Sequence, residues 1–232
     1  MKTSRMIEKS LRIHVDAETR VSARWLGRQN DGSRQEALLV LAHGAGNDME
    51  NPFISFVHER VAALGIATLK FNFPYKEIGR KAPDPAPRLE ATWRSILHRA
   101  QTDPAIRAGK IFAGGKSLGG RVASQVVAGG EDVAGLVFLG YPLHPPGRQD
   151  KPRTAHFSNL RVPALFVQGT RDTLCDLEML RESLASVPGR TTLHLVDGGE
   201  HSFKLPKRYG ISQETVWETI AVAVVNWVST QL

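Results

Sequence analysis

Short apolar runs alternate along most of the chain with longer segments in which apolar residues recur every three or four positions. Continuous apolar runs are typical of strands buried on both faces of a parallel sheet, whereas the longer period is typical of helices. The predicted strands are residues 38–42, 66–71, 111–113, 136–141, 164–168 and 191–196. The predicted helices are residues 52–64, 88–101, 174–187 and 212–230, with a further helix directly after Ser117.

The N-terminal part of the chain has a different pattern. Residues 11–16 and 21–26 alternate between apolar and polar positions, and the short polar segment 17–19 separates them. This pattern predicts a hairpin at an edge of the sheet. Asn30-Asp31-Gly32 predicts a turn, and residues 74–87 are expected to form a polar, proline-rich loop.

Together these elements predict an α/β fold with a doubly wound, mostly parallel, eight-stranded sheet that helices cover on both faces. No internal repeat and no linker-like segment divides the sequence, so we expect a single domain over residues 1–232. A chain of 232 residues can bury a full core for one such domain. Its 41% hydrophobic and 23% charged residues are ordinary for a soluble globular protein.

The N-terminal sequence MKTSRMIEKS lacks the apolar core of a signal peptide. The longest apolar runs, such as residues 221–225, fall far short of the ~20 residues that span a bilayer. We therefore expect a cytoplasmic protein without a membrane partner.

The single cysteine, Cys175, excludes an intrachain disulfide and a cysteine-based zinc cluster. We expect it to be a small apolar residue that fills space at the start of a helix.

The formal net charge is +7, which raises the question of a nucleic-acid partner. The basic residues are scattered, however, and occur only in short pairs such as Lys207-Arg208 and Arg80-Lys81, with no aromatic residues interleaved. This distribution indicates a solvated basic surface rather than a nucleic-acid site. Such a surface would attract small anionic molecules.

Candidate chemistry lies in the segment from Lys110 to Arg121, which contains Gly115-Lys116-Ser117-Leu118-Gly119. The pattern G-x-S-x-G after a strand and before a helix marks a nucleophile elbow, a strained turn that lifts a serine hydroxyl clear of the sheet. We expect Ser117 at unusual backbone angles, with neighbouring backbones too close for a Cβ at Gly115 or Gly119. The helix N-terminus would favour negative charge at the same place.

Two other readings of this segment are possible. A glycine-rich turn with Ser117 as a helix N-cap would carry no chemistry. Gly115-Lys116-Ser117 also ends like a phosphate-binding P-loop, but that motif requires glycine at position 110, where the chain has Lys110. The apolar residues between these positions also indicate a strand rather than a phosphate loop.

Two further residues follow predicted strands in the order that a serine triad requires. Asp172 follows strand 164–168 and His201 follows strand 191–196, so both should lie at the same edge of the sheet as Ser117. A serine hydroxyl needs a base such as imidazole, and a buried carboxylate fixes the imidazole tautomer. Asp172 could instead be a helix N-cap and His201 an ordinary loop residue. The alternative acids are Asp176 and Asp197, and the alternative base is His43.

The loop His43-Gly44-Ala45-Gly46 follows the first buried strand and has little side-chain bulk. Such a loop can direct a backbone N–H at a developing oxyanion, and the N–H of Leu118 is the second expected donor. We assign the first donor to Ala45, with Gly46 as the alternative, and expect His43 to brace the loop. The candidate substrate-lining residues are His43, Gly46, Lys116 and Tyr141. No metal site and no cofactor is predicted.

On the basis of these motifs, the chain resembles an α/β-hydrolase over nearly its whole length. Within that superfamily it is similar to a group near the dienelactone hydrolases, which includes the hydrolase-like domain shared by testis-expressed protein thirty and the third subunit of the non-specific lethal histone-acetylation complex. Dienelactone hydrolases use a cysteine nucleophile where this chain has Ser117, which counts against that particular activity. The matching segments are residues 43–46, 114–120, 140–147, 168–172 and 198–203.

Two functions are compatible with these observations. One is a serine hydrolase of carboxylic esters or related small acyl compounds, and the other is a non-catalytic interaction module, as the histone-acetylation relative implies. The combination of Ser117, Asp172, His201 and a glycine-rich oxyanion loop favours the enzyme. The oligomeric state and the substrate are not predicted.

The space available for a cap over the site is small. Only 21 residues separate Tyr141 from Pro163, and four of them are prolines, which block long helices. We therefore expect no separate cap domain and an open pocket that suits short acyl chains. Arg148, Lys151 and Arg153 in this segment would favour acidic substrates such as hydroxy-acid esters or lactones.

Overall fold

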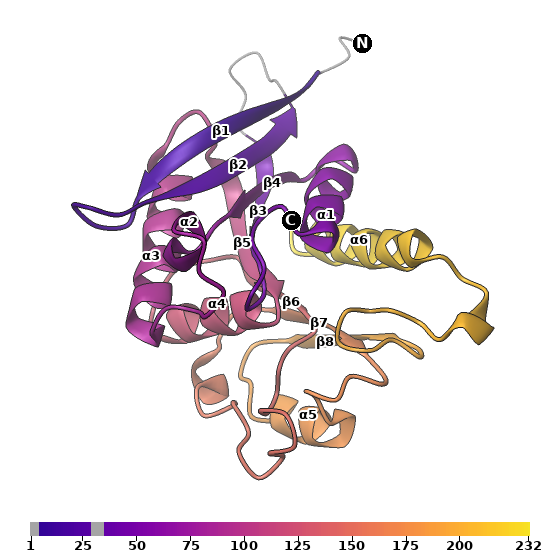
Figure 1. Ribbon diagram of the computed structural model, residues 1–232. Helices are drawn as coiled ribbons and strands as arrows, with labels where there is room; N and C mark the ends of the chain where they lie inside the picture. Colours follow the sequence, from indigo (N-terminus) through magenta and orange to yellow (C-terminus); the bar gives the residue numbers. More distant parts are fainter. Residues whose placement is uncertain (1–4, 29–34) are drawn as a thin grey trace.

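The apolar runs of the sequence form the inner strands of one eight-stranded sheet (Figure 1). The structure is a computed structural model that describes residues 5–28 and 35–232. The strand order is β1-β2-β4-β3-β5-β6-β7-β8. The strands are β1 (Met6–His14), β2 (Arg20–Arg28), β3 (Gln35–Ala42), β4 (Ala67–Phe71), β5 (Ala108–Lys116), β6 (Gly135–Leu139), β7 (Ala164–Gly169) and β8 (Thr191–Val196).

The N-terminal hairpin forms one edge of this sheet, as its alternating pattern predicts. β2 runs antiparallel to both β1 and β4, and all the strand pairs from β4 to β8 are parallel. The carboxyl ends of β3, β5, β7 and β8 therefore lie along one rim of the sheet. The turn predicted at Asn30-Asp31-Gly32 lies outside the described residues.

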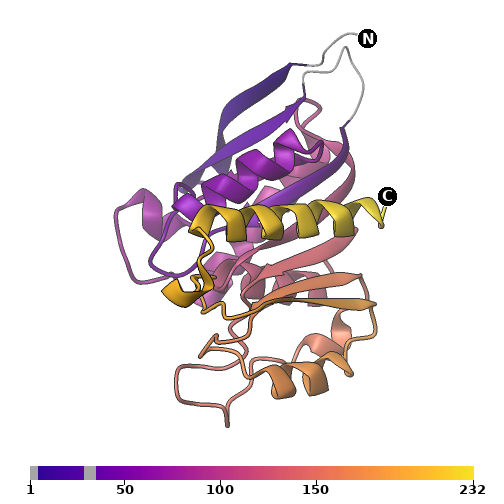
Figure 2. The same ribbon diagram turned by 90° about the vertical axis from the view of Figure 1, so that its right-hand side faces the viewer.

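Helices cover both faces of the sheet (Figures 1 and 2). α1 (Pro52–Ala63) and α6 (Gln213–Ser229) pack against each other on one face, and α3 (Ala86–Thr102) and α4 (Leu118–Ala128) on the other. Successive residues of a strand point to opposite faces. Leu38 and Val40 of β3 accordingly join the core under α3 and α4, whereas Leu39 and Leu41 join the core under α1 and α6.

Some elements differ from the sequence-based prediction. The segment 74–87 contains a short helix, α2 (Pro74–Glu77), because Pro74 presets the first helical turn and the Tyr75 side chain is buried. α5 (Leu177–Leu184) begins later than predicted, because Asp176 caps it. β6 ends at Leu139, since Gly140 turns the chain with φ 72°. The remaining helical pieces are the 3-10 turns η1 (Phe157–Asn159) and η2 (Lys207–Tyr209).

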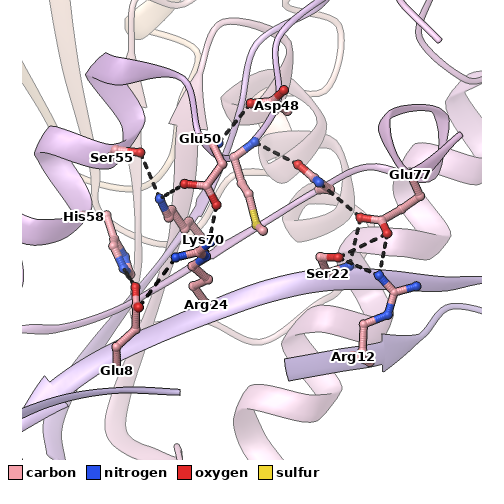
Figure 3. A network of polar contacts seen from close by, with 12 residues as sticks. Glu8, Arg12, Ser22, Arg24, Asp48, Glu50, Ser55, His58, Lys70 and Glu77 are labelled. Atoms are coloured by element: carbon pink, nitrogen blue, oxygen red, sulfur yellow. Dashed lines mark hydrogen bonds and ion pairs between the residues drawn. The ribbon is translucent and has the colours of Figure 1, made fainter. Parts of the chain in front are cut away.

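A network of polar contacts joins the hairpin to the loops beside the rim (Figure 3). The carboxylate of Glu77 on α2 accepts hydrogen bonds from Arg12 of β1 (2.6 Å) and from the backbone N–H of Ser22 of β2 (3.0 Å). Asn72 donates to the same carboxylate (3.1 Å) and accepts from the N–H of Met49 (2.8 Å). The loop after β3 is thus tied through α2 to the N-terminal hairpin.

The same network contains a buried cation next to helix α1 (Figure 3). Lys70 of β4 is buried and donates to Glu50 (2.9 Å) and Ser55 (2.8 Å). Glu50 also pairs with Arg24 of β2 at 3.0 Å. Buried ammonium groups require such partners.

Over the described residues, no helix combines the length and the apolar character that crossing a membrane requires.

Candidate active site

Ser117 occupies the strained turn that the glycine spacing predicts. It lies between β5 and α4 with φ 50° and ψ −114°, angles that a residue with a side chain rarely adopts. A Cβ on Gly115 would lie 2.2 Å from the carbonyl oxygen of Ala42, and one on Gly119 would lie 2.5 Å from the same atom. Both glycines are therefore required by the close approach of β3, and the predicted elbow geometry is confirmed.

Ser117, His201 and Asp172 form a continuous chain of hydrogen bonds at the rim of the sheet. The Ser117 Oγ lies 2.9 Å from His201 Nε2, and His201 Nδ1 lies 2.7 Å from Asp172 Oδ2. An ionised carboxylate can only accept, so Nδ1 carries the proton and Nε2 is left as the acceptor that faces the serine hydroxyl. The Asp172 side chain is 0% exposed and that of His201 is 25% exposed, so the base is reachable from solvent.

Three donors converge on the Asp172 carboxylate. Besides His201, the Gln168 amide donates to Oδ2 (2.6 Å) and the N–H of Leu174 donates to Oδ1 (2.9 Å). Burial by itself would raise the pKa of Asp172, but the hydrogen bonds from His201 and Leu174 and the charges of His201 and Lys116 together hold the pKa below its usual value. The carboxylate therefore stays ionised although it is buried.

Gln168 is a site residue that sequence reasoning missed. Its amide oxygen accepts from the N–H of Tyr141 (2.9 Å), which fixes the amide so that its NH₂ group faces Asp172. The signal was present in the sequence, because a glutamine at the end of a predicted buried strand needs polar partners.

The alternative acids have other functions in the fold. Asp176 is the N-cap of α5 and accepts from the N–H of Met179 at 3.0 Å. Asp197 is exposed, and its carboxylate contacts the hydroxyl groups of Thr170 and Tyr209, each at 3.3 Å. Of the three candidate acids, Asp172 is the one that contacts His201.

His43 lies within the core behind the oxyanion loop. The N–H of Phe73 can only donate, so His43 Nε2 accepts from it (3.2 Å) and Nδ1 donates to the carbonyl oxygen of Gly44 (2.9 Å). Burial lowers the pKa of His43 to about 4, against a smaller raising effect of the Gly44 hydrogen bond. The ring is thus neutral at neutral pH with both nitrogens engaged, which leaves His201 rather than His43 as the base at Ser117.

The Gly44–Ala45 peptide has a defined orientation. The Gly44 carbonyl oxygen accepts from His43 and from the N–H of Asn47 (3.3 Å), and the Tyr75 hydroxyl faces it at 3.5 Å. In a trans peptide the N–H points opposite to the carbonyl, so the Ala45 N–H is directed away from His43 and Tyr75. Gly44 lies close to the nucleophile elbow: a Cβ added to it would be 3.6 Å from the Cβ of Ser117.

The N–H of Gly46 has a different environment. Burial raises the pKa of Tyr75 to about 12, and a backbone hydrogen bond from Gly46 opposes that rise. On the other side of Ser117, Leu118 is the first residue of α4, so its N–H has no acceptor within the helix. The assignment of Ala45 as the first oxyanion donor, with Leu118 as the second, remains a prediction.

The four candidate substrate-lining residues differ in exposure. His43, Lys116 and Tyr141 are all buried, whereas Gly46 is exposed. Tyr141 packs edge-on against Phe138 and Phe157 in the core, and its hydroxyl donates to the carbonyl of Arg153. The burial of His43, Lys116 and Tyr141 indicates that their side chains pack within the protein, and the substrate-lining role remains a prediction.

The segment between β6 and β7 carries no cap domain. Its helical content is the 3-10 turn η1, and Leu143, His144, Phe157 and Leu160 are buried. The N–H of His144 donates to the Leu174 carbonyl (3.2 Å), and His144 Nε2 accepts from the N–H of Asp176 (3.3 Å). The segment is thus fixed to the loop that carries Asp172.

Among residues 5–28 and 35–232, no three His, Cys, Asp or Glu side chains are grouped so that they could hold a metal ion. Cys175 is buried beside Asp172, and burial raises the pKa of its thiol to about 12, so it remains a neutral, apolar filler.

Comparisons with known proteins agree with the fold. The family described as "Alpha/beta hydrolase domain" matches residues 35–229. A dienelactone hydrolase from Anabaena variabilis ATCC 29413 is 18% identical, with 97% of this chain and 98% of that chain covered and a TM-score of 0.77. Est1E from Butyrivibrio proteoclasticus is 15% identical, with 96% and 98% covered and a TM-score of 0.73. XC6422 from Xanthomonas campestris, described as an α/β serine hydrolase without lid, is 19% identical, with 84% and 86% covered and a TM-score of 0.63.

Proposed function

The chain belongs to the α/β-hydrolase family, and from that premise we propose that it is a serine hydrolase of carboxylic esters or related small acyl compounds. One observation carries the proposal. A serine hydroxyl, an imidazole and a buried carboxylate are joined by two short hydrogen bonds, of 2.9 Å and 2.7 Å, at the rim where such sheets bind ligands.

In the first step, the Ser117 oxygen attacks the acyl carbon while its proton passes to His201 Nε2. The carbonyl oxygen becomes an oxyanion, and the N–H groups of Ala45 and Leu118 stabilise it. Asp172 stabilises the imidazolium. The carbon–oxygen bond to the alcohol then breaks, His201 returns the proton to the leaving oxygen, and an acyl-enzyme remains.

The second step repeats the first with water as the nucleophile. His201 takes a proton from water, the hydroxide adds to the acyl carbon, and the bond to Ser117 breaks as its oxygen regains the proton. The products are the free acid and the regenerated enzyme. No group beyond the described side chains and backbone donors is needed for this cycle.

A narrower kinship is supported by the five sequence segments that resemble the dienelactone-hydrolase-like group, which includes testis-expressed protein thirty and the third subunit of the non-specific lethal complex. The membership of a histone-acetylation subunit in this group suggests a non-catalytic module as the alternative. A non-catalytic protein has no chemical reason to maintain the Ser117–His201–Asp172 contacts, so the site favours the enzyme.

We expect the purified protein to hydrolyse p-nitrophenyl esters, with the fastest turnover on acetyl or butyryl esters and a decline toward longer chains. The reason is that the segment between β6 and β7 is a proline-rich loop fixed to the body of the protein and provides no apolar roof. A panel of esters from two to sixteen acyl carbons measures this preference.

The panel also separates the two functions. No hydrolysis of any ester, by protein whose fold is verified by circular dichroism, would support the non-catalytic module. A rate that climbs steadily to sixteen carbons would instead show an apolar channel and contradict the open pocket.

A further inference from the structure

Lys116 is a buried cation inside the nucleophile elbow. The residue precedes Ser117 directly and is only 9% exposed. Its ammonium group makes no hydrogen bond to any of the described residues. Removing an ammonium group from water is costly unless other charges compensate for it. Compensating negative charge is therefore expected close to this side chain.

The ammonium group lies beneath the turn that carries His201. Gly140, directly after β6, leaves the space for it, because a Cβ there would be 2.8 Å from Lys116 Nζ and 3.3 Å from the carbonyl oxygen of His201. The Phe203 ring faces Nζ with its centroid at 5.4 Å, and this residue has φ 61°, which closes the turn tightly. Lys116 thus fills the space between the end of β6 and the histidine turn, on the side away from solvent.

Two carboxylates act on this cation. Burial lowers the pKa of Lys116 to about 8, while the negative charges of Asp172 after β7 and Glu200 after β8 oppose that change. Lys116 in turn is one of the influences that hold the pKa of Asp172 low. The charged groups that act on the ammonium are Asp172 and Glu200, and beside Gly140 the neighbouring group of His201 is its backbone carbonyl.

We propose that Lys116 is a positioning residue whose buried ammonium is the resting counter-charge of the Asp172 carboxylate, which in turn orients His201. This role rests on the proposed hydrolase function. Asp172 is a buried anion, and Lys116 is a buried cation beside the turn that carries its partner His201. When His201 is protonated, two cations share that carboxylate.

The consequence is a shift in the working pH range. The Lys116 cation opposes protonation of the Asp172–His201 pair, because like charges in a poorly solvated region repel. The enzyme therefore remains active at lower pH than it would without the cation. Removing the cation makes the pair easier to protonate, so the acidic side of the pH–rate profile moves to higher pH.

The test is the pH dependence of kcat/KM for p-nitrophenyl acetate, from pH 5 to pH 8, in Lys116→Met. The variant keeps the length of the side chain and removes its charge. We expect the acidic half-activity point to rise by about one pH unit, the size expected of one charge acting across several ångströms of protein interior. Lys204→Met removes a charge from an exposed lysine on the same turn and should leave the profile in place.

An unshifted acidic side in folded Lys116→Met would overturn the proposal, and so would an equal shift in Lys204→Met. Lys116→Gln, which is smaller and keeps a polar end, gives a second neutral variant if the first does not fold, and it should show the same upward shift. If the unaltered protein hydrolyses no ester, the proposed function fails. If it is active and both neutral variants keep its profile, only the role of Lys116 fails.

Discussion

Replacing Ser117 with alanine is expected to lower the rate of ester hydrolysis by several orders of magnitude while the fold is kept. The hydroxyl is the atom that His201 Nε2 contacts at 2.9 Å, and without it no acyl-enzyme forms. Alanine adds no bulk to the elbow, so thermal unfolding should be little changed. Steady-state rates on the preferred short ester, compared for the two proteins, measure the effect.

Ser124 provides a matched control. It lies on α4 and its hydroxyl also contacts a histidine, His156 Nε2 at 2.7 Å, but it is fully buried and donates to the Arg121 carbonyl. Ser124→Ala should keep its rate within a few-fold of the unaltered protein. If Ser117→Ala hydrolyses the ester at a comparable rate, the nucleophile has been misassigned.

Asp172→Asn is expected to lose about 10⁴-fold in kcat, by analogy with the same change in other serine triads. Three donors, from His201, Gln168 and Leu174, converge on the carboxylate, and only a group that accepts at both oxygens satisfies them all. An asparagine must place its NH₂ group opposite one of these donors. Where the NH₂ group faces His201, the imidazole takes the wrong tautomer and cannot accept the serine proton.

Two control variants test whether the loss of activity is specific to Asp172 or follows from the removal of any nearby carboxylate. Asp176→Asn keeps a good N-cap for α5, and Asp197→Asn alters an exposed side chain, so both should retain most of the activity. The kcat values of the three variants on one ester are compared after their folds are checked. Near-full activity in Asp172→Asn together with a large loss in Asp197→Asn would show that the acid lies elsewhere.

The parts of the site that the sequence predicts are those that local sterics determine. Gly115 and Gly119 are required because the carbonyl oxygen of Ala42 lies 2.2–2.5 Å from where their Cβ atoms would be. The G-x-S-x-G pattern that places these two glycines around Ser117 can be recognised in one short segment of sequence. The order of Ser117, Asp172 and His201 is equally visible, because each lies in the loop that follows a predicted strand. In a parallel sheet those positions meet at one rim.

The parts that the sequence did not predict depend on the direction of side chains in three dimensions. The side chains of Lys116 and Tyr141 are buried, and their burial depends on the turn at Gly140 and on packing that one segment of sequence does not reveal. Gln168 reaches Asp172 only because the N–H of Tyr141 fixes its amide, a contact between residues 27 positions apart. Helix α2 was missed because its four residues are too few to show a helical period.

The central claim is that Ser117 is an activated nucleophile, and covalent labelling tests it most directly. The protein is treated with a fluorophosphonate probe, and the modified peptide is identified by mass spectrometry. The account predicts one adduct per chain, located on Ser117, with none on Ser117→Ala or on protein unfolded before treatment. An adduct on another residue, or labelling that persists in Ser117→Ala, would contradict the account.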